Sequence, residues 1–325
     1  MIIQAENLTR DFKIYDNSKG ALSNLKEKVL NRGRTVRVVD NINFAINKGD
    51  FVGYLGPNGA GKSTTIKMLS GILVPTSGKI LIDGKEPYKN RISHAKNIGV
   101  VFGQRTQLWW DLPLLESFML LGRIYGLPKK KLKSKLDNLI NALDLSSFLY
   151  TPVRELSLGQ RMKGDLVASL IHDPQVLFLD EPTIGLDILA KEQIQQFLLQ
   201  LNKQEKVTII LTTHNVDDIE KLCERVIFID NGSIVFDGKS TQLAEKFGES
   251  RVLVIETDAT YSNLELNGFK HSIEKHKISF ELNSDNEIST ILNALVGKIS
   301  IKNVIIQESK IENVLKKLYL QNGKK

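Results

Sequence analysis

Short apolar runs alternate with segments of helical periodicity over the first 240 residues of the chain. Runs of this length, rich in β-branched residues and bounded by glycine, are typical of buried strands. They lie at 2–3, 36–39, 51–55, 79–82, 98–102, 176–179, 207–211, 226–229 and 234–236. Because helical segments lie between and after the runs at 176–179 and 207–211, the pattern predicts an α/β core with parallel strands.

The last two runs are joined through Asn231-Gly232, a pair typical of a tight antiparallel hairpin. Between residues 104 and 173 the pattern changes to helical periodicity, at 114–125, 132–143 and 159–171, with no convincing strand pattern. We therefore expect a helical insert around residues 105–172 of the α/β domain.

From residue 251 onward the strand pattern restarts at 252–255, 278–282 and 304–306, with helical patterns at 287–296 and 311–320. This second group predicts a small C-terminal α/β module. The expected organisation is a first domain at 1–245, with an α/β core, an antiparallel β subdomain and the helical insert. An accessory or regulatory module follows at 246–325.

Composition adds limits to this picture. The chain has 325 residues, 42% apolar and 25% charged, a balance typical of folded proteins, and its net charge of +7 is compatible with anionic partners. The single cysteine, Cys223, excludes an intramolecular disulfide and favours a reducing, cytosolic compartment and an inert place in the core. The N-terminus lacks a secretory pattern, and no apolar stretch reaches the ~18 residues of a membrane span. We expect any membrane path to belong to another chain.

The clearest chemical motif lies between the run at 51–55 and a helical pattern that extends to residue 69. It fits G-x-x-x-x-G-K-[ST], a loop that binds phosphates. It consists of Gly56, Pro57, Asn58, Gly59, Ala60, Gly61, Lys62, Ser63 and Thr64. Its glycines let successive N–H groups point at phosphate oxygens, and the following helix adds the positive end of its dipole. We expect Lys62 to contact the β and γ phosphates and Ser63 to bind Mg²⁺.

Two carboxylates, Asp180 and Glu181, follow the apolar run at 176–179. Such a run suits a buried parallel strand whose carboxyl end opens at a nucleotide crevice. In that position Asp180 binds Mg²⁺ and Glu181 orients and polarises the attacking water. By itself the run also fits a strand followed by an acidic turn, but its place downstream of the phosphate loop favours the catalytic interpretation.

A phosphate loop alone fits kinases, GTPases and helicases equally well. The sequence Leu156-Ser157-Leu158-Gly159-Gln160, at the start of a helical pattern, resembles the signature motif of the ABC ATPase family. The resemblance implies that Ser157, Gly159 and Gln160 bind the γ-phosphate of ATP held by the opposite subunit. A serine hydroxyl and N–H groups at a helix N-terminus also make an anion site on physical grounds. Taken alone, Ser157 equally fits a simple helix cap. Leu158 stands where the family has glycine, which bears on the subgroup more than on phosphate contact.

The same resemblance implies roles for five further positions. Gln104 is matched to the glutamine that senses Mg²⁺ and joins the core to the helical insert, and His214 to the switch histidine that contacts the γ-phosphate. Asp187 is matched to the acid that crosses the dimer interface. The aromatic residue that stacks on adenine is Phe12, with Tyr15 as the alternative.

The resemblance covers residues 1–240 and implies a P-loop ABC ATPase that uses ATP and Mg²⁺. It implies a second motor subunit, identical or related, and separate membrane-spanning permease subunits, with this chain peripheral at the cytoplasmic face of the membrane. The segment around Trp109 and Trp110, together with Leu158 and a basic stretch at 19–37, resembles the motor subunits of bacterial drug, viologen and polysaccharide exporters. We expect the tryptophans to form a docking groove for the permease; the alternative is burial within the insert.

Two other classes of protein are alternatives. An importer motor carries the same motifs, because the permease largely sets the direction of transport. A soluble ABC ATPase acting on ribosomes or DNA is favoured only by the basic charge, and the second motor domain or long coiled coil usual in such proteins is not visible. We therefore expect no nucleic-acid partner, and we interpret the stretch at 19–37 as a solvated loop or short helix and the lysines at 129–135 as a solvated helix face.

Overall fold

The computed structural model describes residues 1–14, 34–103, 105–213, 215–247, 251–261, 269–282 and 286–307. The chain divides into two compact units, Met1–Ser240 and Thr241–Lys325. The sequence pattern alone places this division at 245/246.

The first unit is built on a six-stranded sheet with the strand order β5-β6-β7-β3-β8-β9. The strands are β3 (Phe51–Leu55), β5 (Ile98–Phe102), β6 (Val176–Asp180), β7 (Thr208–Thr212), β8 (Arg225–Asp230) and β9 (Ser233–Lys239). The first five strands in this order run parallel, and β9 returns antiparallel beside β8 through the predicted hairpin turn, where Asn231 and Gly232 both have positive φ. The carboxyl ends of β3, β5, β6 and β7 therefore share one edge of the sheet.

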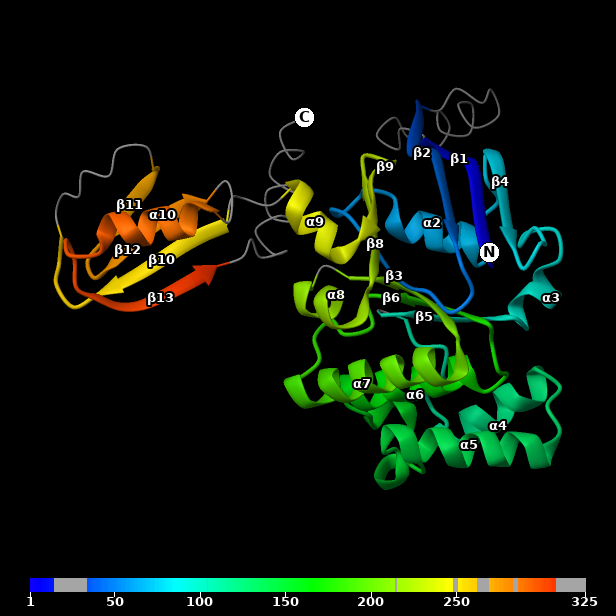
Figure 1. Ribbon diagram of the computed structural model, residues 1–325. Helices are drawn as coiled ribbons and strands as arrows, with labels where there is room; N and C mark the ends of the chain where they lie inside the picture. The colour runs from blue at the N-terminus through cyan, green and yellow to red at the C-terminus, as the bar shows by residue number, and fades with distance from the viewer. Residues whose placement is uncertain are drawn as a thin grey trace, which may run out of the picture. The chain divides into compact units, whose positions relative to one another are not determined.

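A second, antiparallel sheet has the order β2-β1-β4, with β1 at Ile3–Ile14, β2 at Arg34–Ile46 and β4 at Ser77–Ile82. Helix α2 (Lys62–Leu69) lies between this sheet and the parallel one (Figure 1). One hydrophobic cluster joins all three, because Ile3 and Ile42 of the antiparallel sheet, Ile66 of α2, and Tyr54 and Phe178 of the parallel sheet are buried together. This core fixes α2 directly behind the phosphate loop.

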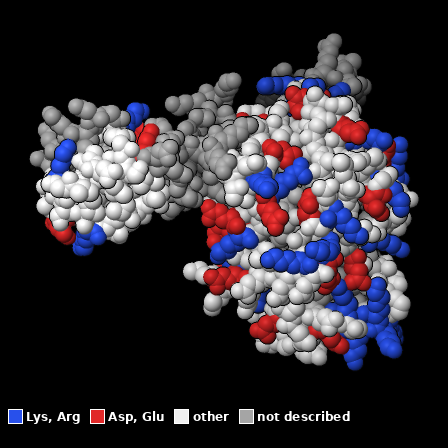
Figure 2. Space-filling model, viewed as in Figure 1, with Lys and Arg blue, Asp and Glu red and all other residues white. Residues whose placement is uncertain are grey.

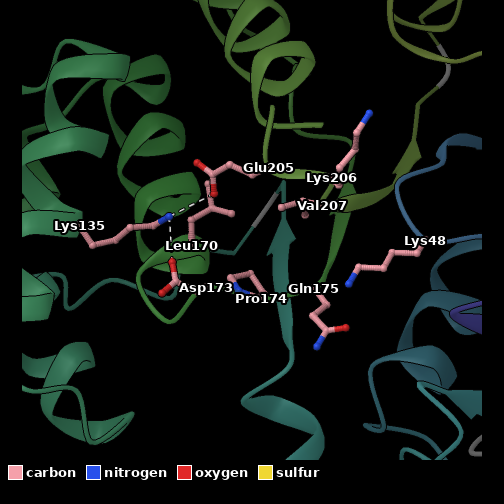
Figure 3. Close-up of a pocket in the computed structure, with 9 residues that line it drawn as sticks. All are labelled: Lys48, Lys135, Leu170, Asp173, Pro174, Gln175, Glu205, Lys206 and Val207. Atoms are coloured by element: carbon pink, nitrogen blue, oxygen red, sulfur yellow. Dashed lines mark hydrogen bonds and ion pairs between the residues drawn. The ribbon is translucent and has the colours of Figure 1, made fainter. Parts of the chain in front are cut away.

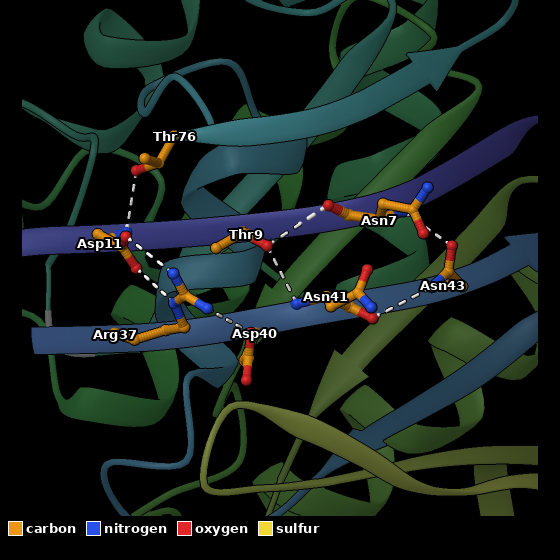
Figure 4. A network of polar contacts seen from close by, with 8 residues as sticks. All are labelled: Asn7, Thr9, Asp11, Arg37, Asp40, Asn41, Asn43 and Thr76. Carbon is orange, nitrogen blue, oxygen red and sulfur yellow. Dashed lines mark hydrogen bonds and ion pairs between the residues drawn. The ribbon is translucent and has the colours of Figure 1, made fainter.

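Strands β1 and β2 are much longer than the apolar runs at 2–3 and 36–39, and polar side chains bond where their backbone pairing is irregular. Their register shifts between Ala5 and Asp11. At these irregular positions the Thr9 hydroxyl accepts a hydrogen bond from Asn41 N at 3.1 Å, and Asn43 accepts one from Asn7 N at 2.8 Å (Figure 4). Beyond this network β1 continues past residue 12 and ends at Ile14. The rest of the basic stretch, residues 19–33, lies outside the described residues.

The predicted helical insert is present, with α4 (Leu114–Ile124), α5 (Lys129–Leu143) and α6 (Leu158–Leu170) at the positions that the periodicity indicates. Two short 3-10 helices, Ser146–Phe148 and Val153–Glu155, connect α5 to α6. Three further helices, α3 (Arg91–Ala95), α7 (Ile188–Glu205) and α8 (Val216–Leu222), complete the described helices of the first unit before α9 (Ser240–Phe247), which lies at the division. Cys223, directly after α8, is buried, and burial raises the pKa of its thiol.

The second unit contains an antiparallel sheet with the order β11-β12-β10-β13. Its strands are β10 (Arg251–Thr257), β11 (His271–Glu274), β12 (Lys277–Leu282) and β13 (Ile301–Gln307). Helix α10 (Asn286–Leu295) packs on one face through Ile291 and Leu295. The hydrophobic pattern gives no sign of β11, a short strand in which exposed and half-buried residues alternate, and the predicted helix at 311–320 lies outside the described residues.

Figure 2 shows acidic and basic side chains interspersed over most of the visible face of the first unit, with Lys and Arg gathered near the start of α5 at the lower right. Lys129, Lys130, Lys131 and Lys133 are all exposed there. Within the described part of the chain, no helix combines the length and the apolar character needed to cross a bilayer.

Lys135 of α5 ties the helical insert to the α/β core. Its ammonium lies 2.9 Å from Asp173, before β6, and 3.3 Å from Glu205, at the end of α7, beside a small cavity of about 170 Å³ (Figure 3). Burial lowers the pKa of this ammonium, but the hydrogen bond to Asp173 and the charge of Glu205 outweigh burial, so the pKa is raised.

We predict that Lys135→Ala lowers the free energy of unfolding by about 1 kcal/mol, the upper range for partly exposed ion pairs, and that the loss shrinks in high salt. Urea unfolding at low and high salt measures both effects. Lys133→Ala, on the exposed side of the same helix, is the matched control. Equal losses for the two variants would show that the ion pairs contribute nothing.

Candidate functional site

A pocket of about 850 Å³ opens at the edge of the parallel sheet where β3, β5 and β6 end. Its lining combines the antiparallel sheet, the loop after β3, α2 and the residues that follow β5 and β6. The lining residues are Phe12, Val38, Asn58, Gly59, Gly61, Lys62, Ser63, Thr64, Lys67, Ile72, Leu73, Phe102, Gly103, Arg105, Asp180 and Glu181.

The loop 56–61 passes so close to backbone carbonyls at two positions that only glycine fits there. A Cβ atom on Gly56, at φ 155°, would lie 2.1 Å from Ile229 O, and one on Gly61, at φ 107°, would lie 2.7 Å from Val38 O. Ala60 N donates to Pro57 O at 3.1 Å and closes the turn. Helix α2 begins at Lys62, so the N–H groups of its first turn, including those of Ser63 and Thr64, face the pocket end of the helix.

Lys62 is the buried cation of this pocket, with 7% of its surface exposed. Its ammonium donates to Gly56 O at 2.6 Å and to Pro57 O at 2.9 Å, which braces the loop from inside. Burial lowers the pKa of Lys62, while the charges of Glu181 and Asp180 act in the opposite direction. The loop thus presents a lysine with two carboxylates close enough to influence its charge.

Asp180 and Glu181 are positioned by the end of the neighbouring strand β7. The Thr212 hydroxyl donates to Asp180 Oδ1, and Glu181 N donates to Thr212 O at 3.0 Å. Glu181 has a positive φ of 56°, so the chain turns sharply as it leaves β6. Both acids line the pocket together with Lys62 and Ser63.

The oxygen donors of this pocket suit Mg²⁺ held jointly with phosphates. Ser63 supplies a hydroxyl and Asp180 a carboxylate, both hard ligands of the kind that Mg²⁺ prefers. In the part of the chain that the structure describes, no three His, Cys, Asp or Glu residues cluster as an all-protein metal site would require. Ser63 and Asp180 are the described residues that would hold the ion, together with oxygens of a bound phosphate.

Phe12 lies at the rim of the same pocket, at the end of β1. The guanidinium of Arg10 lies over its ring at 4.6 Å from the centroid, and Arg10 is itself held by a 2.8 Å hydrogen bond to Val74 O. Cation–π contact of this kind fixes an aromatic plane. Tyr15, the alternative stacking residue, lies outside the described residues.

The signature residues form a separate site at the start of α6. Ser157 caps the helix, accepting from Gln160 N at 3.2 Å, while Ser157 N donates to Gln160 Oε1 at 2.9 Å. Gly159 lies close to Ala190 and Asp187 at the start of α7, where Asp187 caps that helix by accepting from Ala190 N at 2.9 Å. Ser157, Gly159, Gln160 and Asp187 are therefore brought together, but none of them lines the phosphate pocket described above.

Gln104 and His214 lie outside the described residues, although their neighbours are informative. Gly103 and Arg105 both line the phosphate pocket. On the other segment, the Thr213 hydroxyl donates to Asp218 Oδ2 at 3.0 Å and accepts from Asn215 N at 3.0 Å. Both flanking segments are thus fixed by hydrogen bonds close to the pocket-forming strand ends.

Asp218 is a structural part of this region that the sequence motifs missed. Its side chain is fully buried and accepts hydrogen bonds from Thr183 at 2.6 Å, Thr213 at 3.0 Å and Gln195 at 2.6 Å. One carboxylate therefore holds the segment after Glu181 and the segment after β7 together. The only sequence signal was an acidic residue in the first turn of α8, which looks like an ordinary favourable charge near a helix N-terminus.

A glycine-rich loop at a helix N-terminus, a buried lysine and two acids at the end of a parallel strand define a P-loop nucleotide-binding protein. Comparisons with known proteins narrow this class. A family model described as "ABC transporter" matches residues 39–184. The ABC transporter ATP-binding protein NatA of Bacillus subtilis is 33% identical over 224 residues, which cover 69% of this chain and 91% of that protein.

One further relative agrees in sequence with this family, and one solved structure agrees in fold. The Nod factor export ATP-binding protein I of Ralstonia nicotianae is 38% identical over 206 residues, 63% of this chain and 64% of that protein. A dimeric ATP-binding cassette solved in a post-hydrolysis state with ADP and phosphate has the same fold, with a TM-score of 0.61, 23% identity, and coverage of 73% of this chain and 98% of that one. The chain belongs to the ATP-binding protein family of ABC transporters, and it is an ATP-hydrolysing subunit.

We predict that Asp218→Ala lowers the free energy of unfolding by about 3 kcal/mol, because three buried donors lose their shared acceptor. Urea unfolding monitored by circular dichroism provides the measurement. The neighbouring Asp217, whose side chain is 43% exposed and pairs with Lys191 and Lys221, gives the control variant Asp217→Ala with an expected loss of at most about 1 kcal/mol. Similar losses at both positions would contradict the role assigned to the buried network.

Proposed function

We propose that this chain binds and hydrolyses Mg-ATP as one half of a dimer and thereby drives export of a substrate through separate membrane-spanning permease subunits. The observation that carries this proposal is the presence of two distinct half-sites on one chain. The phosphate pocket holds Lys62, Asp180 and Glu181, whereas Ser157 and Gly159 lie at the start of α6, outside that pocket. A complete site then needs the pocket of one subunit and the signature of its partner.

Within the pocket, the chain's own groups divide the work. The N–H groups of residues 58, 59 and 61–64 and the Lys62 ammonium would bind the phosphates, while Ser63 and Asp180 would hold Mg²⁺, which neutralises charge on the phosphates when bound. Glu181 orients and polarises the attacking water. Phe12, with one face of its ring against Arg10, stacks on adenine.

Across the dimer, Ser157, Gly159 and Gln160 of one subunit contact the γ-phosphate held by the other, and Asp187 approaches the other subunit's phosphate loop. In this proposal His214 and Gln104, outside the described residues, contact the γ-phosphate and Mg²⁺. Closure around two ATP molecules pulls the permease subunits, and charge repulsion between the products reopens the pair. The chain then works as a peripheral subunit at the cytoplasmic face of the membrane.

Trp109 and Trp110 are proposed to anchor the permease. The two residues are 37% and 49% exposed, so the alternative expectation that both are buried within the insert is wrong. Their segment is held firmly, since Trp109 N donates to the Ser117 hydroxyl at 3.3 Å, and the Arg161 guanidinium lies 5.3 Å from the Trp110 ring centroid. Rigid, exposed aromatic residues are favourable anchors for protein partners. Export as the direction rests on Leu158 and this tryptophan pair, and an importer motor is the alternative.

We predict that Glu181→Gln lowers the ATP turnover number by at least about a hundredfold, because the neutral amide cannot polarise water as a general base does. Nucleotide affinity should persist, and a dimer should accumulate in ATP, which size-exclusion chromatography detects. Lys62→Ala is the comparison variant, in which both binding and turnover fall. Wild-type turnover in Glu181→Gln would refute the assigned base.

We also predict that the double variant Trp109→Ala, Trp110→Ala loses co-purification with its permease while its ATP affinity stays within about twofold of wild type. Removing two anchoring aromatics from an interface costs several kcal/mol of binding, on the order of a thousandfold in affinity. Tyr150→Ala, which removes an aromatic that is 76% exposed elsewhere on the insert, is the matched control. Unchanged assembly of the tryptophan variant would place the docking site elsewhere.

A further inference from the structure

A buried carboxylate in the signature helix has no part in the chemistry proposed above. Asp165 lies about two turns along α6 from Ser157 and is 5% exposed. Its Oδ1 accepts from the Thr106 hydroxyl at 2.9 Å and from Gln107 N at 3.0 Å. The Gln107 side chain donates back to the main-chain oxygen of Asp165 at 3.0 Å. Three hydrogen bonds thus join one position of α6 to two consecutive residues.

Those two residues directly follow the wall of the nucleotide pocket. Gly103 and Arg105 line the pocket, Gly103 N donates to Asp180 O at 2.8 Å, and Arg105 N donates to Phe102 O at 2.9 Å. Arg105 and Thr106 are adjacent, so at most about 3.8 Å of backbone separates a pocket residue from a residue bound to α6. We therefore expect a shift of Arg105 to be passed on to Thr106 and, through its hydrogen bond, to Asp165.

The contact is also directional. The Thr106 hydroxyl donates to Asp165 while accepting from Leu108 N at 3.1 Å, which leaves it a single orientation. Farther along the same segment, Arg161 of α6 lies over Trp110. The segment 105–110 is consequently attached to the signature helix at two places, one beside the nucleotide pocket and one beside the proposed permease anchor.

Burying a carboxylate costs desolvation free energy, which makes it an unfavourable choice for a contact that only holds two segments together. Burial raises the pKa of Asp165 to about 6, while Gln107 N–H, the Thr106 hydroxyl and the charge of Arg161 favour its ionised form. Buried charges are often replaceable by apolar residues without loss of stability, and in some proteins a buried polar group instead selects one particular arrangement. The arrangement selected here is the position of segment 105–107 on α6.

We propose that Asp165 is a positioning residue that holds segment 105–107, which adjoins the wall of the nucleotide pocket, against the signature helix and so sets the position of Ser157 and Gly159 relative to that pocket. The inference rests on the proposed roles of the phosphate pocket and of Ser157. It predicts that Asp165 acts on turnover in the assembled dimer and leaves nucleotide binding to the pocket itself unchanged.

The test compares full-length variants in ATP turnover and in affinity for Mg-ADP measured by calorimetry. Asp165→Leu, similar in size but unable to accept hydrogen bonds, should lose about tenfold in kcat with Mg-ADP affinity within about twofold of wild type. Asp165→Asn keeps the Oδ1 acceptor and should retain kcat within about threefold. Thr106→Val, which removes only the hydroxyl donor, should fall between them.

The double variant Thr106→Val, Asp165→Leu decides whether the two residues act through one contact. Its kcat should be no lower than that of Asp165→Leu alone, because the second substitution removes a bond already lost. Multiplicative losses, or wild-type kcat in Asp165→Leu, overturn the inference. If Asp165→Leu does not fold, the inference is overturned by a Thr106→Val variant whose kcat equals that of wild type.

Lys62→Ala separates this inference from the proposed function. If Lys62→Ala still hydrolyses ATP, the assignment of the phosphate pocket fails. If Lys62→Ala is inactive while every Asp165 and Thr106 variant has wild-type kcat, only the coupling role fails.

Discussion

The parallel pairing of β6 with β7 is the constraint on which the nucleotide site depends. Asp180 and Glu181 end one strand, and Thr212 ends the other, so the register of the pair brings the Thr212 hydroxyl onto Asp180 and its carbonyl onto Glu181 N. These contacts fix the two acids facing Lys62 across the pocket. Any slip of this pairing would move the acids away from the phosphate loop, because successive strand residues point to opposite faces.

Around this strand pair, buried carboxylates fasten loops that would otherwise be free to choose among conformations. Asp218 joins the segments that follow β6 and β7, and Asp165 joins the segment that follows β5 to the signature helix. Each carboxylate accepts at least two hydrogen bonds, which lowers the free-energy cost of burying it. Neither acid lines the phosphate pocket, and each contacts segments that adjoin it.

The residues assigned to ATP binding lie in two separate parts of the chain, the edge of the parallel sheet and the start of α6. Lys62 and Asp180 sit at the sheet edge, whereas Ser157 caps α6 in the helical insert. The insert is attached to the core by contacts that differ in kind, the ion pairs of Lys135 on one side and the hydrogen bonds of Asp165 on the other. Contacts of both kinds thus connect the insert, which carries the exposed Trp110, with the nucleotide-binding core.

The sequence by itself determined the features whose physics is local. The loop at 56–61 needs glycine, the turn at Asn231 needs positive φ, and the helices of the insert follow apolar periodicity, so each could be predicted from neighbouring residues. Tertiary structure alone decided the lengths of β1 and β2, the exposure of Trp110, and the bonds of Asp165 and Asp218. The bond between Thr106 and Asp165 joins residues 59 positions apart and that between Thr183 and Asp218 residues 35 apart, and no local pattern encodes which distant donor a buried carboxylate will meet.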